Sequence, residues 1–134
     1  MVQGLSHITF IVRDLHRMEQ ILTTVLDAKK IYDSGDNTFS ISKERFFDIG
    51  GVWVATMEGA PLEGKTYNHV AFQMAAEEYD DRLGRKKSLG LDVREGRSRV
   101  GVEGHSIYFY DDDNHLFELH SGSLADRLKL YVQA

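Results

Sequence analysis

The segment that most constrains this fold is SIYFYDDDNHLFELH, which runs from Ser106 to His120. Residues 107–110 and 115–120 alternate in type with a period of two, and the acidic run 111–114 between them is typical of a turn. The pattern therefore predicts a β-hairpin. The same alternation places an ionisable side chain, Glu118, in the middle of an apolar strand.

The charge of Glu118 needs compensation, because an isolated buried carboxylate is strongly unfavourable. A structural salt bridge to a cation such as Arg127 is one solution, since buried carboxylates are often paired in this way. A bound divalent metal ion is the other solution. Other parts of the sequence favour the metal ion.

An internal repeat is the first of these: residues 5–10, LSHITF, are echoed by residues 67–72, YNHVAF. In both copies apolar side chains alternate with the others, so that His7 and His69 point away from the apolar face of their strands. A single strand histidine is more often a hydrogen-bonded structural residue than a metal ligand. The duplicated placement makes a shared function the stronger interpretation.

The repeat extends to the order of secondary structure, which we expect to be strand, helix and three strands in each half. Helical spacing of apolar residues predicts a helix over 15–26, with Asp14 as its N-cap, and a more polar helix over 75–89. The apolar stripe of the polar helix consists of Tyr79, Leu83 and Leu89. The remaining predicted elements are strands at 30–33, 38–42, 52–58 and 92–94, the hairpin, and a last helix at 123–131.

Length and composition fit one compact domain, since the chain has 134 residues of which 42% are hydrophobic. We predict an α+β fold of paired βαβββ modules within a single domain of residues 1–134. The first module covers about 1–60, the second about 65–120, and the C-terminal helix about 123–132.

Charge and residue content exclude several classes of function. The formal charge of −5 disfavours general attraction to nucleic acid or to an acidic membrane surface, so small molecules or proteins are the expected partners. The chain has no cysteine, which excludes disulfides, thiolate nucleophiles and cysteine-built zinc sites. We find neither a signal-like N-terminus nor a run of about 18 apolar residues, and therefore expect a cytoplasmic protein.

The candidate site residues are those on the strand faces that carry few apolar side chains. Two histidines and a carboxylate on rigid strands, His7, His69 and Glu118, form a facial triad that leaves coordination positions open for water or substrate. Nitrogen and oxygen ligands suit Mn²⁺, Fe²⁺, Ni²⁺ or Zn²⁺. Two irregular segments, 42–48 and 94–104, are expected to be loops that cover or contact a ligand. The same inventory of candidate site residues contains Thr9, Tyr67, Gln73, Ser106, Tyr108, Tyr110 and His120.

These motifs together resemble the vicinal oxygen chelate superfamily and, within it, the fosfomycin-resistance proteins of the hydrolytic FosX type. The resemblance rests on the paired histidine strands, the segment YFYDDDNHLFELHSGSL and the terminal GSLADRL, and it covers essentially the whole chain. It implies a metal-dependent epoxide hydrolase that adds water to fosfomycin, gives an inactive diol and so confers antibiotic resistance. It also implies a domain-swapped homodimer, in which His7 joins His69 and Glu118 of the other chain.

The resemblance assigns roles to individual residues. His7, His69 and Glu118 match the metal ligands, with Mn²⁺ as the usual ion, and Glu44, expected in a loop after the third strand, matches the general base. The thiol-transferring relatives carry a lysine and serines in the loop before Tyr108, where this chain has Ser98 and Val102. Arg97 or Arg99 is a candidate to replace the missing lysine. The full set of expected substrate-binding residues is Thr9, Tyr67, Ser98, Arg99, Tyr108 and Arg127.

Other functions remain open on the same fold. A transferase that adds glutathione or another thiol to fosfomycin would leave Glu44 idle. A metal-free drug-binding protein would bind its ligand without turnover, and an extradiol dioxygenase would use the same ligand set with Fe²⁺. The site has to decide between them, because a shared fold does not guarantee a shared function.

Overall fold

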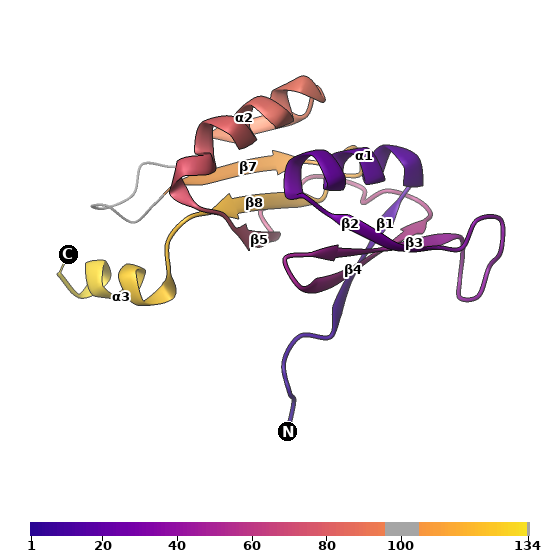
Figure 1. Cartoon of the computed structure of the whole chain (residues 1–134), viewed down its shortest axis with the longest axis horizontal. Coiled ribbons are helices and arrows are strands. Elements are labelled where there is room, and N and C mark those ends of the chain that lie inside the picture. The colour runs from indigo at the N-terminus through magenta and orange to yellow at the C-terminus, as the bar shows by residue number, and fades with distance from the viewer. Residues whose placement is uncertain (96–104, 134) are drawn as a thin grey trace. The chain divides into compact units, whose positions relative to one another are not determined.

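The computed structural model describes residues 1–95 and 105–133, which form two compact units (Figure 1). The first unit is Met1–Lys65 together with Asp112–His115, and the second is Thr66–Asp111 together with Leu116–Ala134. Each unit contains one four-stranded sheet. Residues 96–104, for which the sequence predicted a ligand-contacting loop, lie outside the described residues. They include Arg97, Ser98, Arg99 and Val102.

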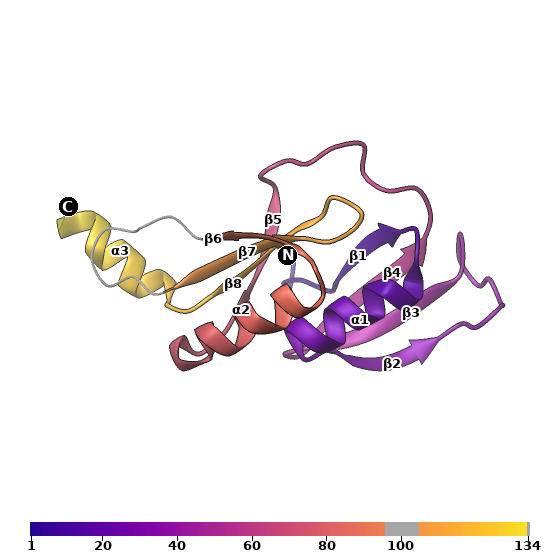
Figure 2. The same ribbon diagram turned by 90° about the horizontal axis from the view of Figure 1, so that it is seen from above.

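The sheet of the first unit has the strand order β1-β4-β3-β2, in which β1 and β4 are parallel and the other pairs are antiparallel. Figure 2 shows α1 lying along one face of this sheet. The elements of this unit are β1 (His7–Val12), α1 (Leu15–Leu26), β2 (Lys29–Asp33), β3 (Glu44–Ile49) and β4 (Val52–Glu58).

Helix α1 confirms the prediction for residues 15–26. Asp14 is its N-cap and accepts a hydrogen bond from the backbone N–H of Arg17 at 3.0 Å. The helix ends at Asp27, whose φ of 53° is left-handed and allows its N–H to bond back to the carbonyl of Leu22. Its apolar stripe packs on the sheet and leaves the opposite sheet face available. The buried stripe is Leu15, Met18, Ile21, Leu22, Val25 and Leu26.

The second unit repeats this topology, with strand order β5-β8-β7-β6 and only β5 and β8 parallel. The strand, helix and three-strand order expected in each half is therefore confirmed, as is the hairpin between 107 and 120. The elements are β5 (His69–Gln73), the 3₁₀ turn η1 (Ala76–Glu78), α2 (Tyr79–Ser88), β6 (Asp92–Glu95), β7 (Ser106–Tyr110), β8 (Leu116–His120) and α3 (Leu124–Gln133).

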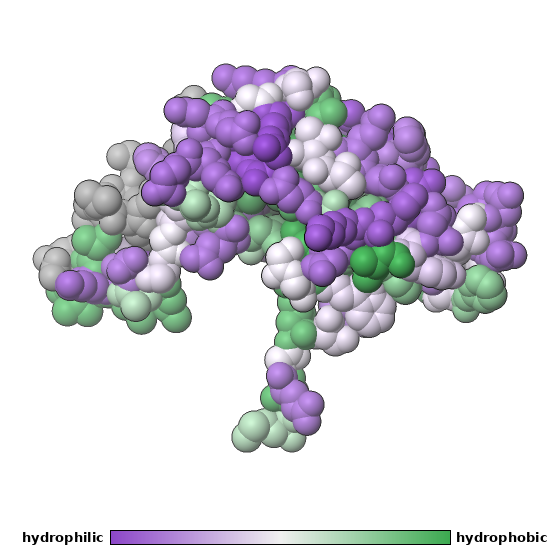
Figure 3. Space-filling model, in the orientation of Figure 1, coloured by the Kyte–Doolittle hydropathy of each residue, from purple (hydrophilic) through white to green (hydrophobic). Residues whose placement is uncertain are grey.

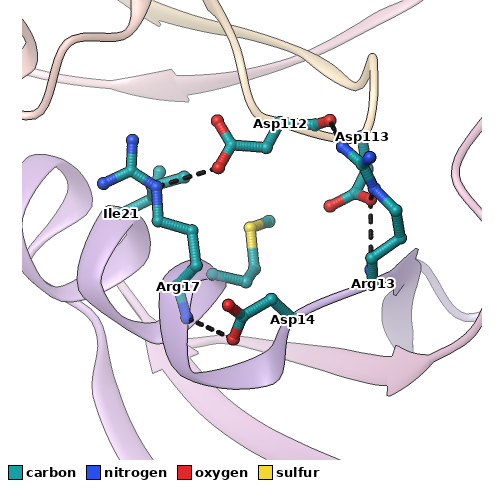
Figure 4. A pocket seen from close by; sticks show the side chains of 7 residues that line it. Arg13, Asp14, Arg17, Ile21, Asp112 and Asp113 are labelled. Carbon is teal, nitrogen blue, oxygen red and sulfur yellow. Dashed lines mark hydrogen bonds and ion pairs between the residues drawn. The ribbon is translucent and has the colours of Figure 1, made fainter.

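The acidic turn of the hairpin is anchored by arginines at the start of α1 (Figure 4). The backbone N–H and Nε of Arg13 donate to Asp113 Oδ1 at 3.1 and 3.0 Å, and Arg17 Nε lies 2.9 Å from Asp112 Oδ2. The side chain of Asp113 is only 5% exposed. Because a buried carboxylate without such donors would be costly, the acidic run is a structural feature of the first unit rather than a solvated loop.

The predictions for residues 38–48 were wrong in part. Residues 38–42, expected to be a strand, form bends, whereas β3 occupies 44–49 in the segment that was expected to be a loop. Residues 44–49 alternate as a strand does, with Phe47 and Ile49 buried on the side that α1 covers. The charged residues of this segment make the alternation difficult to recognise in the sequence. Glu44 is consequently the first residue of a strand and not part of a loop.

The predicted polar helix also differs from expectation. It begins with the turn η1, and the buried residues of α2 are Arg82 and Lys86, while the expected stripe of Tyr79, Leu83 and Leu89 is half-buried. Lys86 is 0% exposed, its Nζ has no hydrogen-bond partner, and it lies 5.5 Å from the ring centroid of Phe109. Burial, together with the neighbouring charge of Lys87, lowers the pKa of Lys86 to about 8.

The C-terminal helix α3 covers the segment that was expected to be helical. Its apolar residues Leu124, Leu128, Tyr131 and Val132 are all at least half exposed, and Figure 3 shows hydrophobic surface gathered over this helix. Within the described part of the chain, no helix has the length and apolar character needed to cross a membrane. The cytoplasmic location stays a prediction from the sequence.

Replacement of Lys86 by Met should raise the free energy of unfolding at pH 7 by roughly 1–3 kcal/mol, because it removes a buried amine that has no partner. The lysine has a lower pKa in the folded chain, about 8, than its ordinary 10.5. The free-energy cost of burying the charged amine is therefore complete below about pH 8 and decreases as the pH rises towards 10.5. Denaturant unfolding at several pH values should show that the stability gained by Lys86→Met decreases between about pH 8 and pH 10.5.

The matched control is Lys87→Met, on the exposed side of the same helix, which should change stability little. A Lys86→Met protein that is less stable than the wild type at pH 7 would contradict this account of the buried amine.

Candidate functional site

Glu118 lies at the centre of the sheet face opposite the apolar core of the second unit. In the strand register it is directly opposite Ala71 of β5 and Tyr108 of β7, and the residue is only 4% exposed. Ala71 has a small side chain, which leaves space above the carboxylate. The residues that share this face are His69, Ala71, Gln73, Ser106, Tyr108, Tyr110, Leu116, Glu118 and His120.

One partner of this carboxylate is His69, whose Nε2 lies 3.1 Å from Glu118 Oε1. The other ring nitrogen of His69, Nδ1, is 2.7 Å from the carbonyl oxygen of Tyr67. Because a carbonyl can only accept, Nδ1 carries the proton and donates it. In the neutral ring Nε2 then presents a lone pair to a carboxylate oxygen, an arrangement that requires a proton or a metal cation between the two atoms.

The second oxygen of Glu118 supports a cation site further. Oε2 is buried and has no hydrogen-bond partner, although His120 Nδ1 is 3.3 Å away. Both recorded ion-pair contacts of Glu118 are with histidines, so the salt bridge to Arg127 that the sequence left open is not among them. A buried carboxylate oxygen without a donor is unfavourable unless something absent from the polypeptide binds it.

His120 belongs to the inventory of candidate site residues from the sequence, which assigned it no role in the site, and the structure places it beside Glu118. Its Nδ1 is 2.8 Å from Ser106 Oγ, and its Nε2 is 3.4 Å from Arg127 Nη2. The spacing E-L-H in β8, which places His120 two residues after Glu118 and on the same sheet face, was the signal that could have identified it.

A cavity of about 280 Å³ opens over these groups in the second unit. Arg127, from the first turns of α3, brings a guanidinium to it. A carboxylate, imidazoles and a guanidinium together suit a ligand that carries both a metal-binding atom and an anionic group. The lining residues are His69, Ala71, Glu118, His120, Gly122, Ser123, Leu124 and Arg127.

Two tyrosines lie beside the same carboxylate. The hydroxyls of Tyr67 and Tyr108 are 3.2 Å apart, and the ring of His69 packs against both. Burial, the hydrogen bond to Tyr67 and the negative charge of Glu118 raise the pKa of Tyr108 above its usual value. Tyr108 therefore keeps its proton at neutral pH and can donate a hydrogen bond to an anion.

The first unit carries its own set of candidates on the face that α1 does not cover. His7 Nδ1 is 3.0 Å from Ser6 Oγ, and its ring stacks on Trp53 with centroids 4.2 Å apart. The register of β1, β4 and β3 places Thr9 and Glu44 on the same face as His7. This shared face is what the sequence predicted for His7 and Thr9, and the structure adds Glu44 to it.

Glu44 itself is 8% exposed, and its backbone is held by Ser34, whose Oγ accepts from the Glu44 N–H at 2.9 Å. Its sequence neighbours Lys43 and Arg45 are the cations nearest to it along the chain. Lys43 forms an ion pair with Asp36 instead. Arg45 points to the other side of the strand and pairs with Glu19 and Asp33, at 3.0 and 3.2 Å. Among the described residues, Glu44 forms no ion pair with either of these neighbours.

Neither unit alone assembles a complete metal site. Among the described residues of each, no three His, Asp or Glu side chains are close enough to hold one ion. His69 and Glu118 lie in the second unit, and His7 lies in the first unit. The donors present, two imidazole nitrogens and one carboxylate, nevertheless fit a divalent ion such as Mn²⁺, and the buried Oε2 of Glu118 has lone pairs available for it.

Comparison with known proteins decides the family. The model of the Glyoxalase/Bleomycin resistance protein/Dioxygenase superfamily matches residues 4–119. The chain belongs to this superfamily. The fosfomycin resistance protein FosX of Listeria innocua is 57% identical over 98% of both chains, which also confirms membership of the FosX group within the superfamily.

Further relatives refine this placement within the superfamily. The crystal structure of a variant of FosX from Listeria monocytogenes, complexed with Mn(II) and 1S,2S-dihydroxypropylphosphonic acid, matches with a TM-score of 0.89 and 51% identity, over 98% of this chain and 99% of that one. The metallothiol transferase FosB of Staphylococcus saprophyticus is only 32% identical, over 99% of this chain and 86% of its own. The α+β fold of this superfamily, predicted from the sequence, is thereby confirmed.

Mn²⁺ should raise the thermal unfolding midpoint of the wild-type protein, because a ligand that binds only the folded state stabilises it. The expected gain is about 2.7 kcal/mol when free Mn²⁺ is 100 times its dissociation constant. Glu118→Gln should abolish the shift, since the amide cannot replace the carboxylate as a ligand. Differential scanning calorimetry with Mn²⁺ or with a chelator measures both.

Glu63→Gln, at an exposed position, is the control and should respond to Mn²⁺ as the wild type does. An undiminished Mn²⁺ shift in Glu118→Gln would remove Glu118 from the candidate site.

Proposed function

We propose that this protein is an Mn²⁺-dependent epoxide hydrolase that adds water to fosfomycin, gives an inactive diol and so confers resistance to the antibiotic. The observation that carries the proposal is the contact between His69 Nε2 and Glu118 Oε1, two atoms that can both bind a metal ion and that lie 3.1 Å apart beside a cavity. The FosX relatives support it, since one of them binds Mn(II) together with a dihydroxypropylphosphonic acid.

His7, His69 and Glu118 are the proposed ligands of the ion. When bound, a divalent ion supplies Lewis acid chemistry, which polarises the epoxide oxygen and helps to hold the phosphonate. The protein prepares two of these ligands in advance. The Tyr67 carbonyl fixes the tautomer of His69, and strand pairing in β8 fixes the backbone of Glu118.

The phosphonate group of the substrate is held by hydrogen-bond donors around the cavity. Arg127 supplies a guanidinium, which is suited to bidentate contact with such an anion. Tyr108 keeps its phenolic proton and Tyr67 lies next to it, so both can donate. Thr9 is the candidate from the first unit, and Ser98 and Arg99 stay predictions from the sequence.

Glu44 is the proposed general base. Its carboxylate takes a proton from water while the water oxygen forms a bond to a ring carbon and the carbon–oxygen bond of the epoxide breaks. The released oxygen then takes up a proton, so that the product is a diol. Burial on the face shared with His7 and Thr9 supports this role, as does the absence of a recorded ion pair with any described cation.

A thiol transferase is the second candidate, because FosB relatives carry that name at 32% identity. The identity of 57% to FosX over the whole chain favours the hydrolase. The test is to remove metal from the protein, incubate it with fosfomycin, add Mn²⁺ and thiol separately, and identify the products by NMR. A diol that forms with Mn²⁺ and without thiol is the expected result, and a product that forms only with thiol would overturn the proposal.

Glu44→Gln should lower diol formation by roughly 10²–10⁴-fold, because the amide cannot accept the proton from water. The affinity for Mn²⁺ should stay close to that of the wild type, since Glu44 is not a proposed ligand. Steady-state rates and titration of Mn²⁺ binding separate these effects. Unchanged hydration by Glu44→Gln would exclude it as the base, and Glu63→Gln again serves as the control.

The proposed active form is a domain-swapped homodimer with each site built from both chains. The division of the ligands between the two units supports shared sites, because neither unit contains three ligands among its described residues. The exposed apolar residues of α3, including Leu124 and Leu128, support an interface with a second chain.

Mixed dimers test this arrangement. His7→Ala and Glu118→Ala proteins should each be inactive, but refolding them together should restore about a quarter of the wild-type sites, because half of random dimers are mixed and each has one intact site. The measurement is fosfomycin hydration by the mixture. If all ligands came from one chain, the mixture would stay inactive.

A further inference from the structure

The ring of His120 connects three groups of the candidate site. Nδ1 lies 2.8 Å from Ser106 Oγ and 3.3 Å from Glu118 Oε2, and Nε2 lies 3.4 Å from Arg127 Nη2. Ser106 is directly opposite His120 in the register of β7 and β8, so the first of these contacts is set by the hairpin itself. One imidazole thus contacts both a proposed metal ligand and the proposed phosphonate anchor.

The partners of the ring determine which nitrogen carries the proton. A guanidinium nitrogen can only donate, so Arg127 Nη2 donates and His120 Nε2 accepts with its lone pair. The proton of the neutral ring is therefore on Nδ1, which donates to Ser106 Oγ. Glu118 Oε2 gains no hydrogen bond from this ring, and its lone pairs remain free although the ring packs beside it.

We propose that His120 is a positioning residue. The Nδ1 side of its ring, held by Ser106, packs against Glu118 Oε2 and restricts the rotamer of that carboxylate, and its Nε2 accepts from Arg127 and keeps the guanidinium at the cavity. The inference rests on the proposed function, since it assigns the two orienting contacts to metal binding and to phosphonate binding. In this proposal the ring acts through Glu118 and Arg127 and not as a ligand of the ion. The two sides of the ring therefore have separable effects.

The experiment replaces one side of the ring at a time. In His120→Asn the amide can occupy the place of Nδ1 and keep Ser106, but nothing accepts from Arg127. In His120→Gln the amide oxygen can reach the place of Nε2 and keep Arg127, but the Nδ1 side is lost. His16→Asn, on the exposed surface of α1, is the control histidine.

Three measurements are made on each protein: Mn²⁺ affinity from the electron paramagnetic resonance of free Mn²⁺, methylphosphonate affinity of the Mn²⁺-loaded protein by calorimetry, and kcat and KM for fosfomycin. His120→Gln should weaken Mn²⁺ binding about 10-fold or more, as loss of groups that orient a metal ligand does. His120→Asn should leave Mn²⁺ affinity within about threefold but weaken methylphosphonate and raise KM about 10-fold, the effect of a lost orienting hydrogen bond.

Equal effects of both variants on both ligands, or no effect on either, would overturn the inference. Ser106→Ala is a second variant for the Nδ1 side, and Arg127→Lys for the Nε2 side, so that a variant that fails to fold does not remove the test. A wild-type protein that binds Mn²⁺ and methylphosphonate but forms no diol would refute the proposed function while leaving the split between the variants intact.

Discussion

Two hydrogen-bond acceptors that face each other in a partly buried place are the constraint on which this site depends. His69 Nε2 and Glu118 Oε1 are 3.1 Å apart, and the Tyr67 carbonyl holds the proton of His69 on the far side of its ring. The polypeptide keeps them there through the parallel pairing of β5 with β8 and the antiparallel pairing of β8 with β7. Such a pair is favourable only with a proton or a metal cation between the two atoms, so the geometry of the sheet is compatible with a metal ion at this place.

In the proposed mechanism the chemistry is divided between the two units. The second unit provides one imidazole, the buried carboxylate and the guanidinium of Arg127, which suit binding of a cation and an anion. The first unit provides His7 and, on the same sheet face, Glu44. In the proposed mechanism the two halves therefore have different tasks, because one orients the substrate and the other supplies the base that activates water.

Control of charge around Glu44 distinguishes it from an ordinary surface carboxylate. Arg45 follows it directly but lies on the opposite side of β3, where Glu19 and Asp33 bind it. The alternation of a strand is what separates the two charges, since successive side chains point to opposite faces. In a loop, adjacent glutamate and arginine side chains could pair with each other. The placement of Glu44 at the start of a strand is thus relevant to its proposed function.

Much of this architecture follows from local patterns in the chain. The period of two around Glu118, the helical period of 15–26 and the repeat of His7 in His69 are all properties of neighbouring residues, and each predicted its element correctly. The charged residues of 44–49 hid a strand, because the sequence pattern does not show that Phe47 and Ile49 pack beneath α1.

The sequence by itself determined most of the order of the elements and the strand faces of His7, Thr9, His69 and Glu118, because these depend on backbone periodicity, whereas the place of Glu44 came from the structure. Only the tertiary structure decided what each side chain meets. The tautomer of His120, the missing partner of Glu118 Oε2 and the burial of Lys86 against Phe109 depend on contacts between different strands and helices. Contacts of that kind arise from packing, in which residues far apart along the chain become neighbours.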